Sequence, residues 1–574
     1  MEVVATKTIT QRSFFWGLAQ HNKLIKMIEV SRNKQIERVK LSLDSDKFNY
    51  FLAQSLNKVT SHRSLQQLAK TLADHFIQNQ IEIRNKSNQQ RQRQNALPQI
   101  IRRSQQSIKV LPKPPRIEPK QQQIPLNKVP FTILEPQYSY LLGGGNNHEL
   151  IKRIMDTRRE WHQCKSTTRV HFRWQQSNIG YKYYKMNAYN PHRSLVNHFE
   201  FHQEISNKKN LLLNMTTFCD SIHRNVFDIL PVTFIIDFND SQIESHLVAF
   251  LNYYNQYSPN PISQDELLLK KQEIKKKLRI PPSKERRYID YQMKDTFLGD
   301  DYLWLLKPTG LNRGRGINVF NSIDQLTDLL IEYTSGVSEK HIETPNEKIY
   351  QGIIIKSPSF VVQKYIEKPL LINNRKFDIR VWVLVDQDLN CYFFKEGYIR
   401  TASEDFVTND VNNLFIHLTN NAIQKYSQKY GDQEAGNQLS FDQIQKIFKN
   451  KIDFRQVIVK KMKEIAFLVM NSVGNKINRN NRRNCMEIFG FDYFLDEKFN
   501  LYLIEVNTNP CIEESSPLLA QLIPRMLDDA YILTLDSIFN ISREKVSPFP
   551  VKGYQNNENM WQLLGSLKDQ VIYQ

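Results

Sequence analysis

The chain has 574 residues, 40% of them hydrophobic and 11% aromatic, so it is not disordered as a whole, and its length corresponds to about three or four domains. Lysine and arginine number 78 against 59 aspartate and glutamate residues, a net charge of +19. This surplus favours a polyanionic partner, whether nucleic acid, an anionic membrane or an acidic protein segment.

Five widely spaced cysteines without a CxxC pair argue against a disulfide scaffold and against a zinc site. The N-terminal residues contain no apolar core of the signal-peptide type. No window approaches the roughly 18 apolar residues of a membrane span. We therefore expect a reduced, intracellular, soluble protein.

Residues 1–126 differ in composition from the rest of the chain. Residues 78–125 are rich in Gln, Arg, Lys and Pro and poor in apolar residues. Such a segment cannot bury enough surface to offset its conformational entropy, so we predict that it is disordered. Residues 47–77 have helical spacing and are predicted to form a short helical piece.

From residue 128 the sequence becomes typical of a globular protein. An apolar run and a glycine turn precede residues 148–161, whose helical period indicates an α/β unit, and residues 228–238 (DILPVTFIIDF) predict a strand. Residues 263–287 are highly charged and predict a helix followed by a loop. Two interpretations of this insertion remain open: a solvated helix, or a basic surface that binds an acidic partner.

Beyond residue 300, runs typical of strands and of helices alternate. This alternation, with several apparently antiparallel strand pairs, predicts an α+β or mixed α/β body. Residues 546–574 are predicted to be a tail. The predicted strands lie at 303–308, 360–366, 376–385, 390–399, 486–496 and 501–507, and the helices at 321–334 and 457–473.

Residues 373–385 (NNRKFDIRVWVLV) carry charges at every second position of an apolar run. In a strand, alternate residues share one face, so Lys376, Asp378 and Arg380 point the same way while Phe377 and Ile379 point into a core. The charged face predicts either a charged pocket or an exposed ladder of salt bridges, and the residues alone do not choose between them.

Residues 304–317 (WLLKPTGLNRGRGI) combine a strand with a loop that contains Gly310, Gly314 and Gly316. Lys307 ends the strand, and Arg313 and Arg315 lie between the glycines. Glycine lets backbone N–H groups approach phosphates, and basic side chains neutralise them. The alternative is a tight hairpin without a ligand.

Residues 501–510 (LYLIEVNTNP) place Glu505 and Asn507 on one face of a strand, and Asp492 lies in what looks like a neighbouring strand. Two carboxylates and an amide supply the oxygen ligands that Mg²⁺ prefers when phosphates fill its other positions. A pair of strands with polar outer faces is the alternative.

Two further residues are candidates for binding or catalysis. Arg400, in GYIRT, could hold a carboxylate through two hydrogen bonds. His417, in IHLTNN, could titrate near neutral pH or make a structural hydrogen bond.

In chain order, the motifs KPTGLNRGRGI, VVQKYIE, RKFDIR, GYIRT, HLTNN, GFDYFLD and IEVNTNP resemble those of the tubulin–tyrosine ligase-like family. The resemblance covers about residues 128–545. It implies an ATP-grasp-type ligase, in which ATP activates a carboxylate as an acyl phosphate and the amine of an amino acid attacks it. It also implies an extension at 1–127, an N-terminal α/β domain at 128–204, central and C-terminal ATP-grasp domains at 205–364 and 365–545, and a tail at 546–574.

The resemblance assigns roles to residues at matching positions. It implies that Lys307, Arg380 and Arg400 contribute to catalysis, and that Asp492, Glu505 and Asn507 hold magnesium. The Lys208 match is looser, because Asn207 and Lys209 replace the usual neighbours. The implied ATP-binding residues are Lys208, Lys307, Gly310, Gly314, Gly316, Gln363, Lys364, Tyr365, Ile366, Lys376, Asp378, Thr419 and Asn420.

Within the family, the chain is more similar to the glycine-adding branch. The features that carry this similarity are Trp382, the GGGNN segment, and the residues NPCIEE that follow the strand with the predicted magnesium ligands Glu505 and Asn507. The implied substrates are free glycine and glutamate side chains of the acidic C-terminal tails of tubulin, at microtubules of the cytoplasm or of a ciliary or flagellar axoneme. Lysine-rich residues 270–287 and residues 476–483 are candidate tubulin contacts or solvated surface. A polyglutamylase and a non-catalytic microtubule-binding protein are the alternatives. We expect a monomer with no nucleic-acid or membrane partner.

Overall fold

The computed structural model describes residues 137–145, 147–165, 170–185, 194–282, 291–311, 314–338, 354–355, 357–541 and 546–568. The predicted N-terminal extension and Arg313 lie outside these residues. In the described part, no helix is long and apolar enough to span a membrane. The predicted mixed α/β fold is confirmed, with three main sheets and helices packed against them.

The first sheet is parallel, with strand order β2-β1-β3-β4. The predicted helix before its second strand is confirmed, because α4 buries Leu150, Ile151, Ile154 and Met155. The elements are β1 (Tyr138–Leu142), α4 (His148–Met155), β2 (Trp161–Gln163), β3 (Phe172–Trp174) and β4 (Leu195–Val196).

The second, central sheet is antiparallel, with order β5-β10-β6-β7. Its strands are β5 (Thr233–Asp237), β6 (Trp304–Pro308), β7 (Asn318–Phe320) and β10 (Ser359–Lys364). The accompanying helices are α5 (Gln203–Ser206), α6 (Lys208–Ser221), α7 (Ile243–Tyr257), α8 (Gln264–Leu278) and α9 (Ile323–Ser335), and β8 (Val337–Ser338) pairs with β9 (Ile354–Ile355). The charged insertion is the helix that the sequence predicts: α8 begins at a capping box formed by Ser263 and Glu266.

The third sheet has seven strands and follows the order β14-β13-β12-β15-β16, with β11 on β12 and β17 on β13. Its strands are β11 (Leu371–Ile372), β12 (Arg375–Val385), β13 (Asn390–Thr401), β14 (Gln438–Ser440), β15 (Glu487–Leu495), β16 (Leu501–Asn507) and β17 (Trp561–Ser566). The helices around it are α10 (Leu414–His417), α11 (Asn421–Gln424), α12 (Phe441–Phe448), α13 (Lys460–Asn471), preceded by a π-helical turn (Phe454–Val459), and α14 (Pro517–Tyr531).

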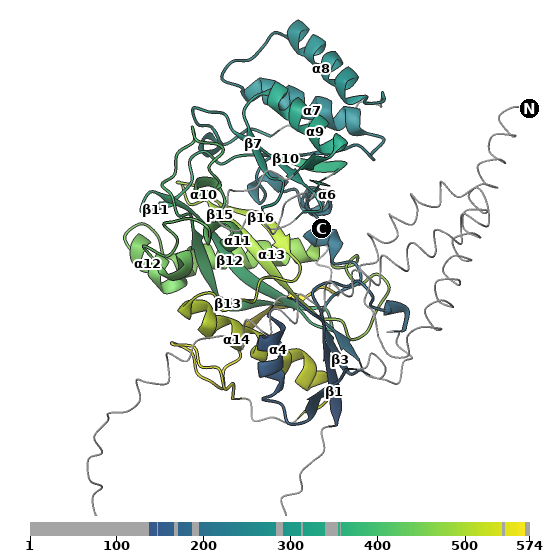
Figure 1. Cartoon of the computed structure of the whole chain (residues 1–574), viewed down its shortest axis with the longest axis vertical. Helices are drawn as coiled ribbons and strands as arrows, with labels where there is room; N and C mark the ends of the chain where they lie inside the picture. The colour runs from purple at the N-terminus through teal and green to yellow at the C-terminus, as the bar shows by residue number, and fades with distance from the viewer. Residues whose placement is uncertain are drawn as a thin grey trace, which may run out of the picture. The chain divides into compact units, whose positions relative to one another are not determined.

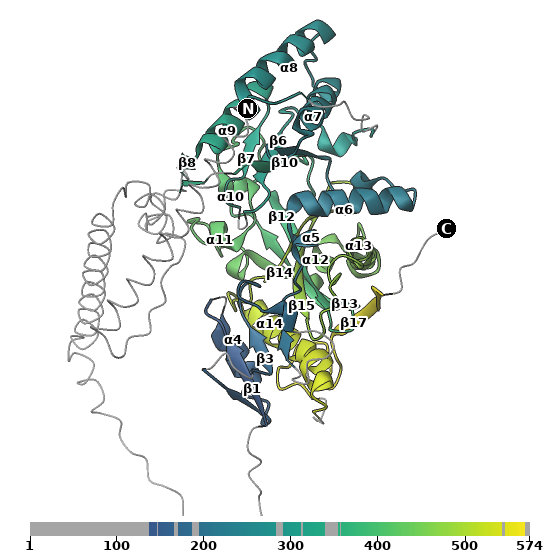
Figure 2. The same cartoon turned by 90° about the vertical axis from the view of Figure 1, so that its right-hand side faces the viewer.

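The two faces of the seven-stranded sheet bury different cores. Phe377, Ile379 and Val381 of β12 point into a core shared with the central sheet and α13. Trp382 and Leu384, on the opposite face, join a second core with the first sheet, α4 and α14. In both views α7, α8 and α9 lie beside the central sheet, whereas α4 and α14 lie at the other end of the seven-stranded sheet (Figures 1 and 2).

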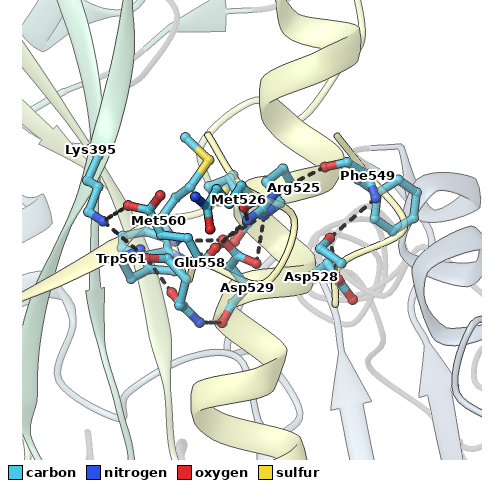
Figure 3. A network of polar contacts seen from close by, with 12 residues as sticks. Lys395, Arg525, Met526, Asp528, Asp529, Phe549, Glu558, Met560 and Trp561 are labelled. Atoms are coloured by element: carbon cyan, nitrogen blue, oxygen red, sulfur yellow. Dashed lines mark hydrogen bonds and ion pairs between the residues drawn. The ribbon is translucent and has the colours of Figure 1, made fainter. Parts of the chain in front are cut away.

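The predicted tail at 546–574 is wrong for residues 546–568. Strand β17 pairs antiparallel with β13 at the side of the seven-stranded sheet, and the Trp561 indole donates to the Met526 carbonyl of α14 at 2.9 Å. Figure 3 shows Arg525 of α14 at the centre of a polar network with this segment. Residues 552–559 are polar and the strand that follows them is short. The sequence of this segment is therefore typical of a C-terminal tail, and its local pattern does not predict the strand.

Candidate nucleotide and metal site

A cleft opens between the central and the seven-stranded sheets. In Figures 1 and 2, α10 lies between these two sheets. Most of the predicted site residues line this cleft, although they come from distant parts of the chain. They are Lys208, Lys307, Gly314, Gln363, Lys364, Tyr365, Ile366, Lys376, Asp378, Arg400, Thr419, Asn420, Asp492 and Glu505.

Strand β12 supplies the charged wall of the cleft. Lys376 and Asp378 line the cleft directly, and Arg380, two residues further, forms a bidentate ion pair with Asp492 of the adjacent strand β15. The pocket interpretation of this strand is therefore correct. Salt bridges are present on the same face, but they are buried rather than exposed.

Two arginines and two carboxylates form a buried network at the centre of the cleft. Arg400 donates to both Asp378 oxygens, at 2.6 and 2.7 Å, and lies 3.0 Å from Asp492. Although burial raises the pKa of the Asp492 carboxyl, Arg380 and Arg400 outweigh burial and hold this pKa at about 2. Asp492 is thus ionised at any physiological pH, and both arginines that were predicted to contribute to catalysis are already paired.

Two lysines of the cleft, the buried Lys307 and the half-buried Lys376, have lowered pKa values. Lys307 donates to the Gln363 side chain at 2.6 Å, and burial, with a smaller effect of Lys208, lowers the pKa of Lys307 to about 8 against the opposing charge of Glu505. Burial and the charge of Lys307 lower the pKa of Lys376 to about 7, against the opposing effect of Asp378. An anion in the cleft would favour the charged form of both lysines.

Lys208 is the first residue of α6, where Asn207 caps the helix by accepting hydrogen bonds from the N–H groups of Lys209 and Asn210. Its ammonium lies 3.4 Å from Glu505 and donates to the Leu311 carbonyl at 3.0 Å. The Lys209 ammonium instead pairs with Asp237 at 2.6 Å. Lys208 is therefore the lysine of this pair that reaches the cleft.

The three predicted magnesium ligands lie together. Asp492 and Glu505 are paired across β15 and β16, and the Asn507 amide donates to both carboxylates at 3.1 Å. Hard oxygen donors of this kind fit Mg²⁺. Among the described residues, no cluster of three or more His, Cys, Asp or Glu side chains is arranged to hold a metal, so this site would rely on Asn507 and on phosphate oxygens beside its two carboxylates.

The glycine loop is both a hairpin and a wall of the cleft. It connects β6 to its antiparallel neighbour β7, and Gly314 borders the cleft. Gly314 and Gly316 have φ angles of +75° and +69°, which disfavour residues with a Cβ atom. Gly310 and Gly316 do not line the cleft.

Arg380 and Asn507 do not line the cleft either. Instead, Arg380 binds Asp492, and Asn507 binds Asp492 and Glu505, which do line it.

The segment from Gln363 to Ile366 lines the cleft, but many of its polar groups are already engaged. The Lys364 ammonium turns away to Glu367 at 2.5 Å and to the Leu303 carbonyl. The backbone N–H groups of Lys364 and Tyr365 donate to the Val232 and Leu303 carbonyls. A nucleobase bound beside this segment would therefore contact mainly the apolar side chains that line the cleft.

Sequence reasoning missed this apolar lining because nothing distinguishes these residues from ordinary core. It consists of Pro231, Leu305, Leu311, Ile317, Leu418, Phe494 and Ile504. His417 also lines the cleft, and its structural alternative is correct: burial, together with the charge of Lys376, lowers the pKa of His417 to about 4.

Several basic residues of the two basic runs form ion pairs within the protein where the structure describes them. Lys270 and Lys277 pair with Glu273, and Lys275 pairs with Glu244. In the second run, Arg482 pairs with Glu200 at 2.8 Å. These contacts favour a surface stabilised by ion pairs over a free basic docking face.

Fold and cleft together define a class: a mixed α/β protein in which cationic side chains face carboxylates on two adjacent strands. Residues 261–540 match the sequence model of the Tubulin-tyrosine ligase family. Each predicted site residue except Lys208 falls within the matched residues.

The curated relatives point to the same family. Tubulin glycylase 3B of Tetrahymena thermophila is 36% identical over 240 residues, which are 41% of this chain and 18% of that protein. Tubulin glycylase 3D of the same organism is 34% identical over 42% of this chain and 21% of that protein. The probable alpha-tubulin polyglutamylase Ttll1, also of this organism, is 27% identical over 42% of this chain and 56% of that protein. The chain thus matches about a fifth of the length of these glycylases and about half that of the polyglutamylase.

Proposed function

We propose that this protein is an ATP- and Mg²⁺-dependent ligase that joins an amino acid to glutamate side chains of tubulin. The observation that carries this proposal is the meeting of Lys208, Lys307 and Lys376 with Asp492 and Glu505 in one cleft. The family domain supports the reaction class.

In the proposed reaction, a substrate carboxylate oxygen attacks the γ-phosphorus of ATP, the bond to the β-phosphate oxygen breaks, and ADP leaves. The amine of the amino acid then attacks the acyl carbon, phosphate leaves, and the amine loses a proton. Lys208, Lys307 and Lys376 would neutralise the phosphates. Magnesium, when bound by Asp492, Glu505 and Asn507, would supply charge neutralisation.

Glycine is the amino acid that we propose. Five tubulin glycylases match this chain with 31–36% identity, against 27% for the polyglutamylase. The residues after the magnesium strand also resemble the glycine-adding branch. We place the activity at cytoplasmic or axonemal microtubules, and we propose that the protein acts as a monomer.

A polyglutamylase is the second candidate. The observation that favours it is the coverage of the probable alpha-tubulin polyglutamylase, 56% of whose length aligns with this chain. Glutamate carries a second carboxylate, which needs a cation in the cleft. Arg380 and Arg400 are already paired with aspartates, and this pairing counts against glutamate as the added amino acid.

The test supplies purified protein, ATP and magnesium with microtubules and either labelled glycine or labelled glutamate. We expect glycine incorporation by the wild type and none by Glu505→Gln. Microtubules whose C-terminal tails have been removed by protease are the acceptor control. Glutamate incorporation alone would establish the second candidate, and incorporation of neither amino acid would refute the ligase proposal.

A further inference from the structure

Two neighbours fix the Lys376 ammonium in the cleft. It donates to the Tyr365 hydroxyl at 3.0 Å and to the His417 carbonyl at 2.9 Å. The ammonium also lies 4.4 Å from the centre of the Tyr365 ring, within the range of a cation–π interaction. Tyr365 and His417 are 2% and 3% exposed, so solvent has little access to these contacts.

The hydrogen bonds beyond Lys376 have a defined direction. The His417 Nε2 atom lies 2.9 Å from the Asp410 carbonyl oxygen, which can only accept, so Nε2 carries a proton. The lowered pKa of His417 keeps the ring neutral at physiological pH, and Nδ1 is therefore an acceptor. The Tyr365 hydroxyl, 2.8 Å from Nδ1, donates to it and accepts from Lys376.

We propose that Tyr365 and His417 are positioning residues that hold the Lys376 ammonium ready for nucleotide phosphates through this directed chain of hydrogen bonds. The chain starts on β12, passes through Tyr365 just after β10, and ends at Asp410 in the loop between β13 and α10. It thus connects the two walls of the cleft. The proposal rests on the proposed function only in that the cleft binds a nucleotide.

Preordering matters here because lysine is one of the side chains that lose most conformational freedom when fixed. A lysine that is already held in place costs less to engage when its ligand arrives. The Tyr365 ring also lies parallel to the Phe406 ring, with centroids 6.4 Å apart, which keeps the hydroxyl aimed at Lys376 and His417.

The charged groups that face Lys376 are Lys307 of β6 and Asp378 of β12, with His417 of α10 neutral beside it. Lys307 disfavours the charged ammonium and Asp378 favours it. Loss of the Tyr365 oxygen removes one acceptor from the ammonium, which lowers the pKa of Lys376 further. Nucleotide affinity should then begin to fall at a lower pH.

The first test measures binding of a non-hydrolysable ATP analogue with Mg²⁺ to the full chain across pH 6–9. Tyr365→Phe keeps the ring and removes the oxygen. We expect binding about tenfold weaker, with the decline in affinity moved to lower pH. The matched control is Tyr253→Phe, which removes a buried hydroxyl that donates to the Tyr291 carbonyl at 3.0 Å, away from the cleft. Its affinity should equal that of the wild type.

A second pair of variants separates positioning from simple anchoring of the loop. In His417→Asn the amide oxygen can take the place of Nδ1 and accept from Tyr365. In His417→Gln the amide nitrogen can take the place of Nε2 and donate to Asp410. If His417 positions Lys376 through Tyr365, His417→Asn should bind the nucleotide analogue more tightly than His417→Gln does.

The outcomes are distinct. If the wild type does not bind the analogue, the proposed function fails and this inference fails with it. If the wild type binds and Tyr365→Phe binds equally well at every pH, the inference alone is overturned. Higher affinity for His417→Gln than for His417→Asn would also overturn it, because the histidine would then act only through the loop.

Discussion

At the scale of single residues, lysines close in sequence differ because their surroundings differ. Lys364 and Lys376 both line the cleft, but the Lys364 ammonium pairs with Glu367, whereas the Lys376 ammonium donates to the Tyr365 hydroxyl and the His417 carbonyl. Lys208 and Lys209 are adjacent, yet Lys209 pairs with Asp237. The chemistry of each site residue is thus decided by its spatial neighbours.

Asp492 and Glu505 should respond differently to loss of charge. Asp492→Asn leaves the buried guanidinium groups of Arg380 and Arg400 with one carboxylate fewer, so we expect destabilisation of about 3–5 kcal/mol. The Glu505 side chain is 20% exposed and lies 3.4 Å from Lys208. Glu505→Gln should therefore lower the free energy of unfolding by at most about 1 kcal/mol. Both variants should lose ligase activity. Urea unfolding beside the activity assay checks this, and equal destabilisation would contradict a binding role for Glu505.

Nucleotide binding should take up protons at slightly alkaline pH. Burial lowers the pKa of free Lys376 to about 7, and bound phosphate favours the charged form, so the pKa rises on binding. Affinity should therefore fall as pH rises above 7. Titration calorimetry at pH 7.5 in two buffers of different ionisation enthalpy measures the uptake, which should drop sharply in Lys376→Met. An unchanged uptake in that variant would assign the protons elsewhere.

At the scale of elements, each face of a strand is determined by what packs on it. Strand β12 buries one face in the core with the central sheet and the other in the cleft and the second core. Strand β17 lies beyond the residues that match the family model. Arg525 nevertheless donates to the Phe549 carbonyl in the segment leading to β17 (Figure 3), and also to the Gln555 carbonyl. The C-terminal segment is therefore part of the folded body.

The contribution of β17 can be measured at two positions of the same strand. Trp561 is 5% exposed, and Trp561→Ala should destabilise the protein by about 3–5 kcal/mol because it leaves a cavity and removes the hydrogen bond from the indole to the Met526 carbonyl. Leu563 is 56% exposed, and Leu563→Ala should change the free energy of unfolding by no more than about 0.5 kcal/mol. Chemical denaturation checks both. Similar values would mean that β17 does not pack as the structure shows.

At the scale of the described body, buried ion pairs connect the parallel sheet to the rest. Arg158, which follows α4, contacts Asp528 at 2.7 Å and Asp536 at 3.1 Å, and its side chain is fully buried. Ser547 of the C-terminal segment donates to the same Asp528. The parallel sheet, α14 and the C-terminal segment therefore share one polar junction inside the second core.

Removing this junction should weaken the whole body. Arg158→Ala takes the guanidinium away from two buried carboxylates, so we expect a loss of about 3–5 kcal/mol. The matched control is Arg153→Ala on α4, where the arginine pairs with Glu514 at the surface, and its effect should stay below about 1 kcal/mol. Unfolding followed by tryptophan fluorescence and by circular dichroism should give coincident transitions in the wild type. Separate transitions would show that the parallel sheet unfolds independently.

The sequence by itself determined features that depend on neighbours along the chain. The alternation in residues 376–380 predicted a charged face, and Glu505 and Asn507 were placed on one side of their strand, because strand geometry repeats every second residue. Only the tertiary structure decided which lysines reach the cleft and which apolar residues line it. It also decided that the His417 carbonyl accepts a hydrogen bond from Lys376 and that residues 561–566 form a strand of the seven-stranded sheet. These outcomes depend on contacts between residues far apart in the chain, for which local periodicity carries no signal.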